Sequence, residues 1–234
     1  TRAIVFDAFG TLIRYTARPA PYGRLVGADG RPVDRLACLT RDVPMATFAV
    51  ELGTEASLDV MEADLAEELS GLRLFPEVPD VLAKARAAGL RLAVCSNLAY
   101  EYGPAVRGLV PELDAYVLSY EVGVAKPHPT MYRLACAELG CAPAEAVFVG
   151  DSKRCDFDGP EHERTGVVVS DPLAFTLDAS EDASDISLQA FQLFDLAGLL
   201  DVVPDKLDTP RALFSALSTA GWSSSSIHFT NVGW

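Results

Sequence analysis

The chain has 234 residues, half of them hydrophobic, and its 33 acidic and 19 basic residues give a formal net charge of −14. This length suits one large domain or a domain with an insertion, and the acidic charge repels nucleic acid and anionic membranes, so we expect neither as a partner. No apolar run approaches the roughly 18 residues of a membrane span, and five cysteines without a Cys-x-x-Cys pair favour a reducing compartment, so we expect a cytoplasmic protein.

The first predicted element is a short buried strand formed by four apolar residues, Ala3 to Phe6. Asp7 stands where this strand should end, and Gly10 breaks the pattern immediately afterwards. In open α/β sheets, sites form beyond the carboxyl ends of the strands, so Asp7 is placed to act on a ligand. An Asp in this position is more commonly a turn or cap residue, and the later stretches must decide between the two readings.

Residues 15–75 differ in character from the strand before them. Residues 15–53 are rich in Gly, Pro and Arg and have few sustained apolar periods. Residues 57–72 carry apolar side chains at helical spacing, namely Leu58, Met61, Leu65, Leu69 and Leu72. We therefore expect residues 15–75 to form an inserted, mainly helical unit that joins the core through the loop after Asp7.

From Pro76 onward, helix-like and strand-like stretches alternate. The predicted strands are 90–95, 115–118, 146–149 and 167–169. The predicted helices are 78–88, 100–109 with a break near Gly103-Pro104, 131–139 and 188–200. This alternation is typical of an α/β fold with a parallel, Rossmann-like sheet covered on both faces. The core then comprises residues 1–14 and 76–203, and residues 204–234, with four consecutive serines, form a partly flexible C-terminal extension.

Polar residues follow several of these strands. Asp7, Ser96 and Asp151 each come directly after a strand-like run, and Lys126 lies on a loop. The strand ends of a parallel sheet share one edge, so we expect these side chains to meet. Two neighbouring carboxylates repel unless a cation lies between them, and the oxygen-preferring ion Mg²⁺ suits that place. Lys126 and Ser96 could then hold an anionic small molecule while Asp7 acts as a nucleophile.

The order and spacing of these residues resemble the haloacid dehalogenase-like hydrolase superfamily, which includes phosphatases. The four matching motifs are Asp7-Ala8-Phe9-Gly10-Thr11, Ser96, Lys126-Pro127, and Gly150-Asp151-Ser152 with Asp156. The resemblance covers residues 1–14 and about 76–200. It implies that residues 15–75 form a mobile helical cap, whose side chains determine the substrate specificity.

The resemblance also implies a magnesium site. Asp7 would be both the nucleophile and a metal ligand. The backbone carbonyl of Phe9 would be a second ligand and Asp151 a third. Asp156 would lie in the outer shell or be linked to the metal through water.

The resemblance further implies how the substrate is held. Ser96 and Lys126 would bind its anionic group and take part in catalysis with Asp7. Asn97, which follows Ser96, is expected to contact the substrate. Thr11 would orient the first loop next to the substrate.

Phe9 departs from the phosphatase pattern. Phosphatases of this superfamily usually carry an Asp there, which protonates the leaving alcohol and activates water, a contribution typically worth 10²–10⁴-fold. An aromatic residue resembles the true 2-haloacid dehalogenases, whose leaving halide needs no proton and whose reaction needs no metal, but these usually have a neutral residue at the position of Asp151. An equal possibility is that Phe9 only packs against the cap.

We give Asp151 the greater weight and expect a Mg²⁺-dependent phosphatase that acts on a small phosphorylated metabolite through an aspartyl-phosphate on Asp7. Two alternatives stay open. One is a 2-haloacid dehalogenase with Asp7 as the nucleophile. The other is a catalytically weak phosphate-binding module, because Phe9 replaces the usual acid–base residue.

Overall fold

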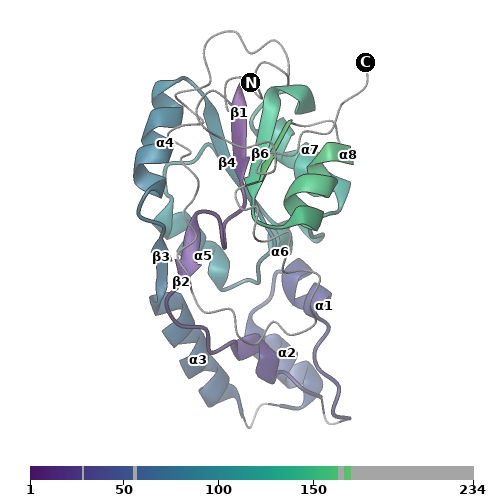
Figure 1. Cartoon of the computed structure of the whole chain (residues 1–234). Coiled ribbons are helices and arrows are strands. Elements are labelled where there is room, and N and C mark those ends of the chain that lie inside the picture. The colour runs from purple at the N-terminus through teal and green to yellow at the C-terminus, as the bar shows by residue number, and fades with distance from the viewer. Residues whose placement is uncertain (28, 55–56, 163–165, 170–234) are drawn as a thin grey trace.

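A five-stranded parallel sheet forms the centre of the protein (Figure 1). The computed structural model describes residues 1–27, 29–54, 57–162 and 166–169. The strand order is β5-β4-β1-β6-β7. The strands are β1 (Ala3–Phe6), β4 (Arg91–Ser96), β5 (Ala115–Leu118), β6 (Ala146–Gly150) and β7 (Gly166–Val169). All neighbours pair in parallel, with Ala3 of the central strand opposite Arg91 on one side and Ala146 on the other. The predicted α/β fold is therefore confirmed.

Helices cover both faces of the sheet. Successive side chains of a strand point to opposite faces, and in β1 this alternation divides the hydrophobic core in two. Ile4 and Phe6 join a cluster with α4 (Val78–Ala87) and α5 (Tyr102–Leu109), whereas Ala3 and Val5 join one with α7 (Pro129–Glu138). The short elements α6 (Ser119–Val122), η3 (Pro143–Glu145), the π-helix η4 (Lys153–Asp158) and α8 (Gly159–His162) complete this part.

Helix α4 shows how the local sequence produces this packing. Its buried residues, Val78, Val81, Leu82 and Ala85, recur three and four positions apart and so form one apolar stripe. Burial of each of the larger side chains is worth roughly 1.5–3 kcal/mol. The chain leaves the helix through Gly89, whose φ of 75° is accessible to Gly without steric cost.

Three helices lie beyond the edge of the sheet at which β1 ends (Figure 1). They are α1 (Arg35–Thr40), α2 (Met45–Leu52) and α3 (Leu58–Ser70), accompanied by the short helix η1 (Pro21–Arg24). We call residues 16–71 the helical unit. Its buried side chains, including Phe48 and Met61, belong to the same hydrophobic cluster as Phe6 of the central strand. The division of the chain into a core and a cap stays a prediction.

An antiparallel pair of strands joins the helical unit to the sheet. Strand β2 (Ile13–Tyr15) pairs with β3 (Leu72–Leu74), with Arg14 opposite Arg73. The sequence did not indicate this pair, because strands of three residues have no readable period. The predicted helix over 57–72 ends at Ser70, since Leu72 already belongs to β3.

The predicted break near Gly103-Pro104 is wrong. Helix α5 runs without interruption from Tyr102 to Leu109. Pro104 falls in the first turn of this helix, where a backbone N–H has no partner within the helix, so its missing donor costs nothing.

The predicted helix over 188–200, the core limit at residue 203 and the extension 204–234 lie outside the described residues. Among the residues that are described, none of the helices has the length and apolar character needed to cross a membrane. All five cysteines are free thiols.

Candidate active site

Three strand ends place polar side chains at one edge of the sheet. Asp7 directly follows β1, Ser96 is the last residue of β4, and Asp151 directly follows β6. Strand β1 lies between the other two, and Phe6 pairs with both Val94 and Val149. The expected juxtaposition is present, and Ser96 is buried within it, with 1% of its surface exposed.

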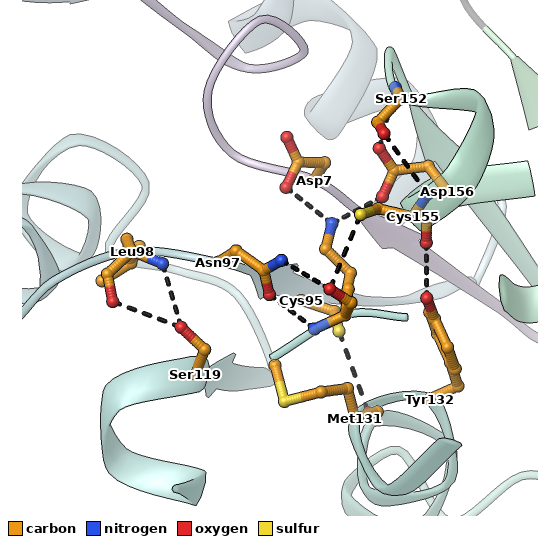
Figure 2. Close-up of polar contacts among 11 residues, drawn as sticks. Asp7, Cys95, Asn97, Leu98, Ser119, Met131, Tyr132, Ser152, Cys155 and Asp156 are labelled. Atoms are coloured by element: carbon orange, nitrogen blue, oxygen red, sulfur yellow. Dashed lines mark hydrogen bonds and ion pairs between the residues drawn. The ribbon is translucent and has the colours of Figure 1, made fainter. Parts of the chain in front are cut away.

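Lys126 links two carboxylates of the site. Its Nζ lies 2.8 Å from Asp7 Oδ1 and 2.5 Å from Asp156 Oδ1, and all three side chains are largely buried. In Figure 2 the carboxylates of Asp7 and Asp156 point towards the same space, where dashed lines mark these contacts. Lys126 retains its charge in this setting: although burial lowers the pKa of its ammonium, the two aspartates raise it well above the usual value.

Asn97 holds the backbone of Lys126 in place. Its Oδ1 accepts from Lys126 N at 2.7 Å, and its Nδ2 donates to the Lys126 carbonyl at 2.9 Å (Figure 2). The Cys155 Sγ lies 3.6 Å from the same carbonyl. Asn97 therefore uses both of its polar groups to position the lysine, and its contact with substrate stays a prediction.

Asp156 is fixed from two sides. Its Oδ1 meets Lys126, and its Oδ2 accepts from Ser152 N at 3.0 Å. A Cβ at Gly150 would lie 2.2 Å from Asp156 Cγ, so the Gly of the Gly-Asp-Ser motif makes room for this carboxylate. Because both oxygens are engaged, the geometry agrees better with the expected outer-shell role than with direct coordination.

Asp151 carries a charge that no described residue compensates directly. Within the described ranges, no side chain forms a hydrogen bond or an ion pair with its carboxylate, whose one hydrogen bond is to its own backbone N–H. Burial is the main cause that raises its pKa to about 7, and repulsion from Asp7 and Asp156 adds to the effect. The loop after β1 comes close to this group: a Cβ on Gly10 would lie 2.0 Å from Asp151 Oδ2, and the φ of Gly10 is 85°.

The donor set fits a hard divalent cation. Asp7, Asp151 and Asp156 each offer a carboxylate oxygen within 4.8 Å of the others. Three carboxylates and one ammonium leave a net charge of −2 when all are ionised, which a single divalent ion balances. No backbone N–H of the described residues donates to the Phe9 carbonyl, so this oxygen is available as well. Oxygen donors of this kind are those that Mg²⁺ prefers.

Phe9 packs into an aromatic group at the boundary with the helical unit. Its ring stacks on Tyr15 with 4.9 Å between centroids and meets Tyr102 edge-on at 5.7 Å. These contacts support the hypothesis that Phe9 has a packing role. Its side chain has no titratable group, and it cannot supply the acid–base function of a carboxylate.

Thr11 is completely buried, and its Oγ1 has no hydrogen-bond partner in the part of the chain that the structure describes. The loop after β1 is instead held by backbone bonds. Gly10 N donates to Ile13 O at 2.9 Å, and Leu12 N donates to Ala8 O at 2.8 Å.

Sequence reasoning missed Glu68 and Tyr102. Glu68 is 5% exposed and accepts from the Tyr102 hydroxyl at 2.8 Å. A signal was present: Glu68 follows Met61 and Leu65 at helical spacing and so lies on the apolar stripe of α3. A carboxylate on such a stripe must find a buried donor.

Comparison with known proteins gives a consistent assignment. The family model described as haloacid dehalogenase-like hydrolase matches residues 1–160. A phosphoserine phosphatase of Thermus thermophilus is 37% identical over 89 residues, which cover 37% of this chain and 36% of that enzyme. The chain thus matches about a third of that relative's length. An (S)-2-haloacid dehalogenase of Xanthobacter autotrophicus is 31% identical over 176 residues, covering 64% of this chain and 68% of that enzyme.

A solved structure of a related fold carries ligands. It is a HAD family enzyme of Bacteroides thetaiotaomicron in complex with magnesium and inorganic phosphate. It superposes with a TM-score of 0.58 at 19% identity and covers 79% of this chain and 98% of its own. At this level of identity the likeness shows the fold alone.

Proposed function

The chain belongs to the haloacid dehalogenase-like hydrolase family, and on that premise we propose that it is a Mg²⁺-dependent phosphatase of a small phosphorylated metabolite. One observation carries the proposal: Asp151 is a half-buried carboxylate that no side chain of the described residues neutralises directly, beside Asp7 and Asp156. A site with this charge favours a bound divalent cation and a phosphoryl substrate. A metal-free reaction with a carboxylate-bearing substrate would face repulsion from all three groups.

Asp7 is the proposed nucleophile. Lys126 Nζ donates a hydrogen bond to Asp7 Oδ1. This bond fixes the carboxylate and leaves Oδ2 for attack on phosphorus. As the new bond between Asp7 and phosphorus forms, the ester P–O bond breaks, and the leaving substrate oxygen takes its proton from solvent, because Phe9 has none to give. Water then hydrolyses the aspartyl-phosphate and returns Asp7 with inorganic phosphate. When bound, Mg²⁺ would neutralise the charge of the transferred group.

Lys126 and Ser96 are the proposed anion-binding groups. A lysine ammonium has three donors, of which two are directed at Asp7 and Asp156, so one remains for a substrate oxygen. Ser96 adds a hydroxyl at the end of the neighbouring strand. The proposed partner is thus a small anionic molecule, and we propose neither nucleic acid nor membrane as a partner. We also propose a cytoplasmic location.

A second candidate is 2-haloacid dehalogenation, which Phe9 and the similarity to the Xanthobacter autotrophicus enzyme favour. In that reaction an oxygen of Asp7 displaces halide from carbon and forms an ester that water hydrolyses. The departing halide needs no proton, so an aromatic residue at position 9 is no handicap. The charge at Asp151 weighs against this candidate unless the group is protonated or bridged by a cation.

The test is a panel of phosphorylated metabolites assayed for phosphate release with Mg²⁺ and with EDTA, beside halide release from 2-chloropropionate. Asp7→Asn serves as the inactive control. Mg²⁺-dependent phosphate release that this variant lacks would support the proposal. EDTA-insensitive halide release would support the second candidate. Tight phosphate binding without turnover would identify a binding module, and absence of metal-dependent release from every substrate would count against a phosphatase.

A further inference from the structure

Two residues at the start of helix α5 form hydrogen bonds with the helical unit. Its N-cap residue Glu101 accepts from the Tyr22 hydroxyl at 2.5 Å and from the backbone N–H of Met45 at 2.6 Å. The next residue, Tyr102, donates its hydroxyl to Glu68 Oε1 at 2.8 Å. Two adjacent core residues therefore bond to three different segments of the helical unit.

The Glu68 and Tyr102 pair is closed off from solvent. Tyr102 is 7% exposed, and both carboxylate oxygens of Glu68 are used, since Oε2 accepts from Ala20 N at 3.0 Å. In the described part of the chain, no lysine or arginine forms an ion pair with Glu68. Burial, together with the bond to Glu68, raises the pKa of Tyr102, so the hydroxyl stays a donor. Loss of this donor would leave a buried acceptor unsatisfied, which is the costly case for a hydrogen bond.

Tyr102 also touches the loop that carries the proposed nucleophile. Its ring meets Phe9 edge-on with 5.7 Å between centroids, and Phe9 lies two residues after Asp7. The Phe9 carbonyl is the proposed backbone ligand of the metal. A continuous path of contacts thus runs from α3 through Glu68 and Tyr102 to the loop after β1.

We propose that Glu68 and Tyr102 are positioning residues that make the conformation of the loop after β1 depend on docking of the helical unit. With the helical unit docked, Glu68 holds the Tyr102 ring against Phe9 and so sets the loop that presents Asp7. With the unit displaced, Tyr102 loses its acceptor and Phe9 loses its edge contact. The importance of this loop for catalysis rests on the proposed function, but the coupling itself does not.

The coupling can be measured without an activity assay. The bonds from Gly10 N to Ile13 O and from Leu12 N to Ala8 O report on the loop, so hydrogen exchange of these amides is the readout. Tyr102→Phe removes the hydroxyl and keeps the ring. We expect it to speed exchange of both amides about tenfold.

Two further variants separate coupling from general loosening. Glu68→Gln keeps a hydrogen bond at both positions, because its oxygen can accept from Ala20 N while its amide NH₂ donates to the Tyr102 hydroxyl oxygen, so we expect a smaller increase in exchange than with Tyr102→Phe. Tyr116→Phe makes the same chemical change on β5, where the hydroxyl donates to the carbonyl of Val110 at the C-terminal end of α5, and we expect no change in loop exchange. If Mg²⁺-dependent phosphate release is present, Tyr102→Phe should lower kcat and kcat/KM together by about tenfold, because nucleophile positioning acts in the transition state.

Unchanged loop exchange in Tyr102→Phe would overturn the coupling, and so would equal acceleration in Tyr116→Phe. Faster loop exchange in Tyr102→Phe, together with a natural protein that hydrolyses no substrate, would support the coupling and count against the phosphatase. Hydrolysis by the natural protein, together with unaltered loop exchange in Tyr102→Phe, would support the phosphatase and count against the coupling. The two proposals therefore fail separately.

Discussion

Replacement of Asp151 by Asn tests the central electrostatic claim. Asp151 Oδ2 lies against the Gly10 backbone, and one carboxylate oxygen of Asp151 lies within 4.8 Å of one from Asp7 and one from Asp156. Asn keeps the shape and removes the charge. In the absence of metal, we expect the variant to be more stable than the natural protein at pH 8, because one of three crowded negative charges has gone.

The pKa shift gives the size and the pH range of the effect. Burial and two neighbouring carboxylates raise the pKa of Asp151 from 3.8 to about 7. Below about pH 4 the group is protonated in both folded and unfolded chains and costs nothing. Between about pH 4 and pH 7 the folded protein binds more protons than the unfolded chain, so its stability falls as the pH rises. At roughly 1.4 kcal/mol per pKa unit, the full penalty above pH 7 is about 4 kcal/mol, and partial solvent access reduces it to about 2–4 kcal/mol.

Urea denaturation at pH 4 and pH 8, in EDTA and in Mg²⁺, measures this penalty. In EDTA at pH 8, we expect the free energy of unfolding of Asp151→Asn to exceed that of the natural protein by about 2–4 kcal/mol. At pH 4 the two free energies should be equal. Mg²⁺ should stabilise the natural protein, by about 2.7 kcal/mol at a hundred times its Kd, and should have little effect on the variant. Asp42→Asn is the matched control, because Asp42 is exposed.

Equal stability of the two proteins at pH 8 in EDTA would refute the reasoning. So would a difference that is already complete at pH 4, since the carboxyl is uncharged there.

Three further substitutions follow from the same site. Lys126→Met leaves Asp7 in a buried cluster without its cation and should cost about 3–5 kcal/mol in urea denaturation, with activity lost. Gly10→Ala forces a methyl group to 2.0 Å from Asp151 Oδ2 at a φ of 85°, so calorimetry should find Mg²⁺ binding weakened or absent. Phe9→Asp should raise the rate of phosphate release by up to about 10²–10⁴-fold, because it adds the missing acid–base group, although the lost ring packing should lower the melting temperature.

Controls for these variants come from the same chain. Gly108→Ala, where nothing lies within 4 Å of the added Cβ, should leave Mg²⁺ binding unchanged. Lys84→Met alters an exposed lysine on α4 and should leave stability within about 0.5 kcal/mol of the natural protein. A Phe9→Asn variant with the same gain in rate as Phe9→Asp would contradict the acid–base argument, because Asn cannot transfer the proton.

The central sheet was predictable because its signals are local. Each strand is a short apolar run, and Asp7 and Asp151 directly follow two of these runs, so the rule for parallel strand ends was enough to bring them together. Lys126 lies on a loop, so the rule for strand ends does not apply to it, and the resemblance to a family strengthened the expectation that it joins the site.

The rest depends on contacts between distant residues. Helix α1 is six residues long and buries only Cys38, which is too little for a readable period. Helix α2 buries Met45, Phe48 and Ala49 at helical spacing, but it also carries apolar residues such as the exposed Val50, so its buried side does not stand out in the sequence. Strands β2 and β3 are stabilised by each other and are too short to be read alone. The role of Glu68 depends on Tyr102, a residue 34 positions away, so its position on an apolar stripe could indicate a buried partner and could not identify it.

The position of β1 at the middle of the sheet has a consequence for synthesis of the protein. Its two neighbours, β4 and β6, are made long after it, and β6 ends only at Gly150. A nascent chain therefore carries Asp7 on a strand with at least one unpaired edge until Gly150 has been synthesised. Such non-local pairing slows folding and exposes backbone to other chains, so translation pauses or chaperones acting before residue 150 should govern the yield of native protein.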